Sequence, residues 1–166
     1  MRNILLLISM LGLLPAGCGH TVSDTDTVSC DTFVYSVKGG DSLRLDRYTD
    51  TPAAEIDAKK PCMIFVFGGA FISGTRDAES YRPFFEYMAR EQGYTVVSID
   101  YRLGLKEPLA AGKLSPETFP QLLPQTVLMA VEDLYDATSF VAGKSAEWGI
   151  CLLYTSPSPR DTERSR

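Results

Sequence analysis

The sequence predicts an α/β fold in which an antiparallel hairpin is followed by parallel strands and helices. Three observations carry this prediction. Two alternating stretches flank a glycine turn, a nearly continuous apolar run ends in a glycine pair, and a stretch of helical periodicity separates that run from a second apolar strand. Strand, helix and strand of this size form a right-handed crossover. The 166 residues, 45% apolar and 22% charged, suit one globular domain.

The first eighteen residues predict an export signal rather than part of the fold. Arg2 supplies a positive charge before the apolar run Ile4–Leu14, which is shorter than the about 20 residues of a membrane-spanning helix. Residues 14–18, Leu-Pro-Ala-Gly-Cys, resemble a bacterial lipobox, in which the thiol of Cys18 accepts the lipid. Residues 19–31 are rich in Ser, Thr and Asp and predict a solvated tether. We therefore expect a lipid-anchored protein of the bacterial cell envelope, periplasmic or on the outer membrane; secretion without an anchor is the alternative.

The hairpin and the first buried strand come next. Alternating stretches at Phe33–Val37 and Leu43–Tyr48 predict two strands joined by a turn at residues 38–41, Lys-Gly-Gly-Asp. Residues 51–60 predict a polar loop. The run Pro61–Phe67 is nearly continuous in apolar residues, as expected for a strand buried on both faces.

Two helices and a second parallel strand are predicted after that run. Apolar residues recur at helical spacing over Glu79–Glu91, and Tyr94–Tyr101 predicts the second strand. Gly104–Leu123 contains several prolines and predicts an irregular loop. Pro124–Ala142 predicts the second helix. Its expected buried stripe is Leu128, Val131, Leu134, Thr138 and Val141.

Charge narrows the class of function. The net charge is −5 and no basic cluster is present, which argues against a nucleic-acid partner. The acidic residues of the second helix, Glu132, Asp133 and Asp136, are expected on its solvated face. Nothing in the sequence predicts a cofactor or a metal site.

Three cysteines follow Cys18. An exported protein could form a disulfide between Cys30 and Cys62. Because Cys62 begins a buried strand, where a small apolar thiol packs well, unpaired thiols are the favoured interpretation.

The glycine loop after Phe67 points to a chemistry. Gly68, Gly69 and Ala70 carry no bulky side chain, so this loop can direct backbone N–H groups toward a developing negative charge. A tight turn that merely needs small residues is the alternative. With the Phe that follows, the helix, and Ile-Asp-Tyr-Arg-Leu at residues 99–103, the segment resembles α/β-hydrolases of the carboxylesterase and hormone-sensitive-lipase type over roughly residues 33–150.

The resemblance implies roles for individual residues. The family's loop usually reads His-Gly-Gly-Gly, and here Phe67 and Ala70 stand at its first and last positions. Neither change removes a backbone N–H. The resemblance therefore implies that the amides of Gly69 and Ala70 form an oxyanion hole, that Gly68 supports the turn, and that the substrate is a small-molecule carboxylic ester.

The remaining catalytic groups are not found in the sequence. It contains no Gly-x-Ser-x-Gly motif, and its single histidine is His20. A serine hydrolase needs a hydroxyl, a base and an acid. Asp100 precedes the position of the family's nucleophile, so Asp100 and Arg102 are expected to be structural. Tyr101 is a candidate pocket residue.

Residues 151–166 change abruptly to Ser, Pro and Arg, and their Cys-Leu-Leu-Tyr-Thr-Ser start resembles translated sequencing adapter; a natural disordered tail is the alternative. We therefore expect residues 32–150 to be a partial α/β-hydrolase domain with an incomplete sheet, a fragment of an exported serine esterase that is inactive alone. In such a sheet Met63–Phe67 would be an uncovered, aggregation-prone edge. A non-catalytic binding lipoprotein on the same scaffold is the alternative function.

Overall fold

The computed structural model describes residues 28–50 and 59–151. The predicted signal peptide with its lipobox, residues 19–27 of the predicted tether, most of the polar loop and all but the first residue of the predicted tail lie outside these residues. The described elements are β1 (Ser29–Lys38), β2 (Asp41–Thr49), β3 (Lys60–Val66), the 3₁₀ turn η2 (Glu79–Tyr81), α1 (Arg82–Arg90), β4 (Thr95–Ile99), α2 (Lys106–Ala110), α3 (Phe119–Gly143) and β5 (Ile150–Cys151).

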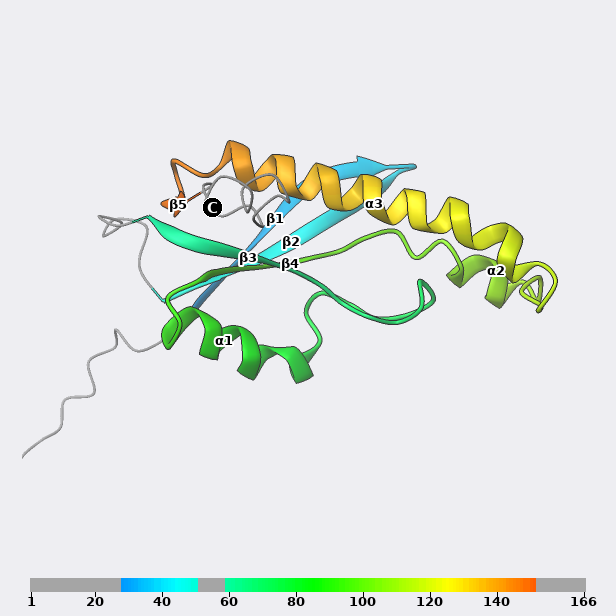
Figure 1. Ribbon diagram of the computed structural model, residues 1–166, viewed down its shortest axis with the longest axis horizontal. Helices are drawn as coiled ribbons and strands as arrows, with labels where there is room; N and C mark the ends of the chain where they lie inside the picture. Colours follow the sequence, from blue (N-terminus) through cyan, green and yellow to red (C-terminus); the bar gives the residue numbers. More distant parts are fainter. Residues whose placement is uncertain (1–27, 51–58, 152–166) are drawn as a thin grey trace, which may run out of the picture.

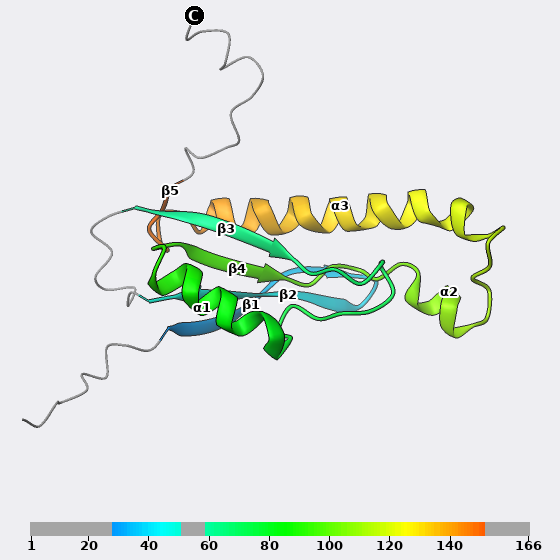
Figure 2. The ribbon, with the colours of Figure 1, turned by 60° about the horizontal axis from the view of Figure 1, so that its bottom comes forward.

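The strands form one mixed sheet in the order β1-β2-β4-β3-β5. β1 pairs with β2 and β2 with β4 in antiparallel fashion, whereas β3 is parallel to both β4 and β5. Helix α3 lies along one face of the sheet and α1 covers the other (Figures 1 and 2). The predicted α/β class is therefore confirmed, including the hairpin and the parallel β3-α1-β4 crossover.

Two apolar clusters hold the layers together, one on each face of the sheet. Leu45, Val97 and Ile99 pack toward α3, whereas Val96 packs with Tyr48 and Phe85 on the α1 side. β4 is buried at every position because it lies in the centre of the sheet. β3 was expected to be buried on both faces but is only half-buried. Among the described residues, β5 pairs with it at Lys60 and Pro61 and leaves the rest of that side of β3 without a neighbouring strand.

Several boundaries differ from the sequence predictions. The predicted tether ends too late, because residues 29–31 already pair with β2. The predicted irregular loop contains the short helix α2, and α3 begins at Phe119 rather than at Pro124. A turn in which the Ser115 N–H donates to Thr118 Oγ1 (2.8 Å) precedes this early start. Pro124 lies inside α3 and removes one backbone donor near its N-terminal end.

The orientation of α3 also differs from the prediction. Its buried residues are Thr126, Asp133, Ala137 and Val141. Of the predicted stripe only Val141 is buried, whereas Leu128 is 63% and Val131 56% exposed. The helix turns its polar Asp133 inward because Arg102, in the segment that follows β4, binds that carboxylate. Within the described residues no helix, α3 included, combines the length and apolar character needed to cross a membrane.

Candidate active-site loop

The loop that follows β3 has an unusual backbone conformation. Gly69 has a φ of 146°, and the next two residues, Ala70 and Phe71, have φ of 53° and 61°. Residues with a Cβ rarely adopt this left-handed region, at a cost of about 1–3 kcal/mol each. Such strain concentrates where a function requires a particular backbone direction.

Backbone hydrogen bonds close this loop upon itself. The carbonyl of Gly69 accepts from the N–H groups of Ile72 (3.0 Å) and Ser73 (3.2 Å). A Cβ on Gly69 would lie 1.9 Å from the Ser73 carbonyl oxygen, so only glycine fits. Among the described residues, none accepts a hydrogen bond from the N–H groups of Gly69 or Ala70. Both residues are exposed, and their amides are therefore available to a ligand.

The segment after β4 supports the start and the middle of the loop. The Tyr101 hydroxyl donates to the Phe67 carbonyl (2.9 Å), and the two buried rings lie 4.6 Å apart. Burial raises the pKa of Tyr101, which keeps its hydroxyl protonated as a donor. Leu105 N–H donates to the Phe71 carbonyl (3.1 Å). A Cβ on Gly74 would lie 2.5 Å from the Phe67 ring, so the far end of the loop also packs on Phe67.

Asp100 and Arg102 have different partners. Asp100 Oδ2 lies 2.9 Å from Arg76 Nη1, whereas Arg102 Nη2 lies 2.8 Å from Asp133 Oδ1. Burial raises the pKa of Asp100, and the Arg76 guanidinium opposes that shift. Their expected structural role agrees with these contacts, but they do not bind each other. Asp133 is fully buried, so its predicted place on a solvated face is wrong.

The other two acidic residues of α3 do face outward. Glu132 and Asp136 each lie 2.8 Å from Lys38 Nζ, at the end of β1. This ion pairing lowers the pKa of both carboxyl groups. These two ion pairs connect the β1–β2 hairpin to the middle of α3, next to the cavity that Lys38 also lines.

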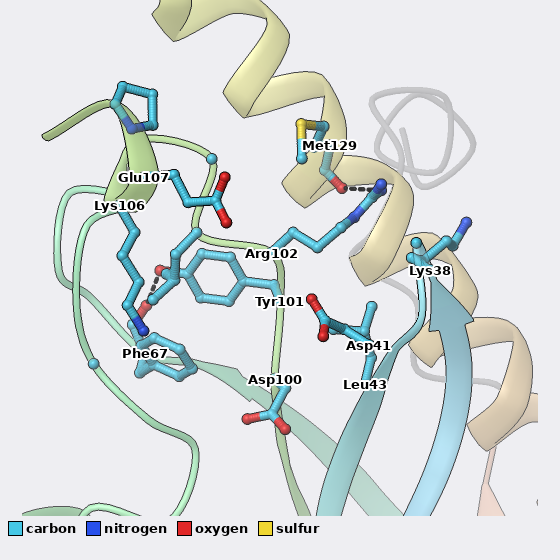
Figure 3. A pocket seen from close by; sticks show the side chains of 15 residues that line it. Lys38, Asp41, Leu43, Phe67, Asp100, Tyr101, Arg102, Lys106, Glu107 and Met129 are labelled. Carbon is cyan, nitrogen blue, oxygen red and sulfur yellow. Dashed lines mark hydrogen bonds between the residues drawn. The ribbon is translucent and has the colours of Figure 1, made fainter. Parts of the chain in front are cut away.

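A cavity of about 760 Å³ adjoins the loop at the carboxyl ends of β3 and β4. Figure 3 shows Tyr101 lying across it, with Lys106 and Glu107 toward one side and Asp41 and Arg102 toward the other. Tyr101 thus lines a pocket, as the sequence suggested. Phe67 and Gly74 bring the two ends of the loop to this cavity. The predicted oxyanion residues Gly69 and Ala70 and the turn residue Gly68 lie beyond its lining.

Arg76 also contributes to the site, although no motif in the sequence points to it. This residue lies on the far side of the glycine loop, and its partners Asp46 and Asp100 come from two other segments. No local pattern links these positions. Cys30, Cys62 and Cys151 are free thiols, and the described part of the chain contains no cluster of side chains suited to a metal ion.

Comparisons with known proteins agree with this architecture. The profile of the carboxylesterase family matches residues 15–109. A non-reducing polyketide synthase, trt4, of Aspergillus terreus is 34% identical over 100 residues, which are 60% of this chain and 4% of that protein. The probable N-octanoylanthranilate hydrolase AqdA2 of Rhodococcus erythropolis is 36% identical over 87 residues, covering 52% of this chain and 19% of that one.

Solved esterases share the fold. The thermophilic esterase Est2 of Thermogutta terrifontis superposes with a TM-score of 0.53 at 25% identity, over 73% of this chain and 36% of that chain. Two further structures of this enzyme, one phosphorylated by paraoxon and one bound to butyrate, each superpose with a TM-score of 0.52. The chain thus spans less than a fifth of these curated relatives and little more than a third of the esterase. The family match, over more than half of its length, shows that the chain belongs to the carboxylesterase family of α/β-hydrolases.

Proposed function

We propose that this chain supplies the oxyanion-stabilising part of an exported serine hydrolase that acts on carboxylic esters. The observation that carries the proposal is the left-handed Gly69–Phe71 loop at the end of β3, with unused amides at Gly69 and Ala70. Attack of a hydroxyl on an ester carbonyl places negative charge on the carbonyl oxygen. Preorganised N–H donors about 2.7–3.1 Å from that oxygen stabilise it.

The nucleophile, base and acid would come from outside the sequence given. That sequence has no Gly-x-Ser-x-Gly motif, and His20 is its only histidine. In the α/β-hydrolases that the chain resembles, the nucleophile-bearing strand lies beside the strand that carries the glycine loop. β5 occupies that place, next to β3. We therefore expect the 166-residue chain alone to be inactive.

Small esters are the proposed substrates. The solved relative has been captured with butyrate and phosphorylated by paraoxon, which is consistent with a short acyl group and an attacking side chain in that enzyme. The cavity of about 760 Å³ beside Phe67 has the volume of a small-molecule site.

The activity test compares two proteins with short aryl esters. The uninterrupted gene product that contains this chain should hydrolyse them, and the 166-residue chain should not. A serine-directed phosphonate should abolish turnover. Replacement of the nucleophilic serine, which we expect in a Gly-x-Ser-x-Gly motif of the gene product, by alanine should also abolish it. Ester binding without turnover in the gene product would favour the non-catalytic binding protein instead.

Lipid anchoring is a separate part of the proposal and rests on the lipobox-like residues 14–18. In a bacterial host, labelled palmitate should enter the protein through Cys18. The variant Cys18→Ser should lose the label and leave the membrane fraction. Equal labelling of both proteins would rule out Cys18 as the anchor.

A further inference from the structure

One arginine joins the far end of the glycine loop to two strands of the sheet. Arg76 Nη1 donates a hydrogen bond to Asp100 Oδ2 (2.9 Å), just after β4, and Arg76 Nε lies 3.0 Å from Asp46 Oδ2 on β2. The contact with Asp46 is an ion pair, since the Nε–H makes no hydrogen bond to any described residue. The side chain of Arg76 is only 14% exposed and that of Asp46 4%. The hydrogen bond to Asp100 and the ion pair with Asp46 together restrict where this planar, rigid guanidinium can lie.

The partners of Arg76 are themselves held in place. Thr32 Oγ1 donates to Asp46 Oδ1 (2.6 Å), and the Arg44 N–H donates to Asp100 Oδ2 (3.3 Å). The buried Ser98 hydroxyl donates to the Arg76 carbonyl (2.8 Å), which attaches the backbone of Arg76 to β4 as well. Side chain and backbone of Arg76 are therefore both tied to the sheet.

We infer that Arg76 is a positioning residue for the oxyanion loop, an inference that rests on the proposed function. The left-handed conformations of Ala70 and Phe71 are disfavoured and persist only where the surroundings impose them. The start of the loop is held through Phe67 and its middle through Phe71. Arg76 holds the end. Because Arg76 does not line the cavity, it acts through the loop and not on the substrate.

The test uses the uninterrupted gene product and the variant Arg76→Lys. Lysine keeps the positive charge but cannot bind both carboxylates in one fixed geometry. We expect kcat for short aryl esters to fall about tenfold to a hundredfold, less than the about 10²–10³ lost with an oxyanion donor itself, while KM changes little. Arg82→Lys is the matched control, since Arg82 is 63% exposed and pairs with Glu86 at 2.9 Å within its own helix; its kcat should stay unchanged.

Hydrogen exchange gives a second readout that does not depend on turnover. In Arg76→Lys, but not in Arg82→Lys, the amides of Ile72 and Ser73, which donate to the Gly69 carbonyl within the loop, should exchange faster. Asp46→Asn removes the negative charge that pairs with Arg76 on β2. It should also lower kcat and speed up exchange of the loop amides, so it tests the inference even if Arg76→Lys fails to fold.

Two outcomes separate the hypotheses. Folded Arg76→Lys or Asp46→Asn protein with unchanged kcat and unchanged loop exchange would overturn the inference, even if its melting temperature fell. If the uninterrupted gene product has no esterase activity, the proposed function is refuted. Hydrogen exchange of the loop amides would then still show whether Arg76 positions the loop.

Discussion

Neighbouring residues of the loop after β3 differ in whether their positive φ is accompanied by a Cβ. Gly69 has to be glycine, because a Cβ there would collide with the Ser73 carbonyl. Ala70 and Phe71 adopt left-handed backbone although each carries a Cβ. The loop is therefore strained where its amides are unused, which suits a site that must present N–H groups before substrate arrives.

Replacing Gly69 by alanine should destabilise the chain by at least about 2 kcal/mol, because strain adds to a backbone clash. Gly143→Ala is the control. A Cβ at Gly143, the last residue of α3, would meet nothing within 4 Å, and the change should stay within about 0.5 kcal/mol or stabilise. Urea unfolding measures both. Equal midpoints for the two variants would show that the loop has another conformation.

The thiol of Cys62 should be unreactive in the folded chain. Burial raises its pKa from 9.0 to about 12, so almost no thiolate exists near neutral pH. Mass spectrometry with a thiol reagent should show labelling of the exposed Cys30 before Cys62, and equal labelling of both in denaturant. Rapid labelling of Cys62 in the native chain would contradict its burial.

The raised pKa of Cys62 also makes stability depend on pH. Because the folded pKa lies above the unfolded one, the contribution of this thiol to stability is complete below pH 9.0 and is lost as the pH rises toward 12.

At the scale of elements, the ion pair between Arg102, in the segment after β4, and Asp133 of α3 decides how the helix lies. Arg102 Nε and Nη2 both contact the Asp133 carboxylate, at 2.8–3.0 Å, and Asp133 also accepts from the Arg102 backbone N–H. The helix therefore turns Asp133 toward the sheet and leaves Leu128 and Val131 outside. A polar contact has here overridden the apolar periodicity of a long helix.

Asp133→Ala should therefore be costly. It removes the buried carboxylate that accepts hydrogen bonds from the Arg102 side chain and backbone N–H. Because Arg102 is 23% exposed and keeps Glu132 as a partner, we expect a loss of about 1.5–3 kcal/mol in the free energy of unfolding. Glu132→Gln is the matched control on the same helix and the same arginine. Its side chain is 54% exposed, so its loss should stay below about 1 kcal/mol. Similar urea midpoints for both variants would mean that α3 is not held through Asp133.

At the scale of the whole molecule, the sheet has an uncovered edge along β3. Lys60 N–H donates to the Gly149 carbonyl (2.7 Å), so by the two-residue period Cys62, Ile64 and Val66 direct their N–H groups to the same side. Within the described residues, β5 pairs with β3 only at Lys60 and Pro61. The rest of this apolar edge can template pairing with another chain.

Self-association of the 166-residue chain should therefore depend on this edge. Val66 is 42% exposed, and Val66→Lys should lower the associated fraction in sedimentation velocity because an edge lysine opposes strand pairing. Leu109→Lys, at a 48% exposed position on α2, is the control with the same gain of charge. If both variants reduce association equally, net charge is responsible and the β3 edge is not.

Local signals in the chain were enough to predict most elements and the place of the candidate loop. The glycine turn at residues 38–41, the apolar run before Gly68 and the helical spacing before β4 each act over a few residues. For that reason the hairpin, the crossover and the position of Gly69 and Ala70 at the end of β3 could be predicted. The inward face of α3 could not, because it depends on Arg102, about thirty residues away.

The amino-acid sequence by itself determined the α/β class, the order of the elements and the strand that carries the glycine loop, since backbone propensity and periodicity are local properties. Only the tertiary structure decided that Arg76 binds Asp46 and Asp100 and that Asp133 turns inward. Those features depend on contacts between segments that are far apart in the sequence. Such contacts are determined by long-range packing and charge pairing, so no short stretch of sequence predicts them.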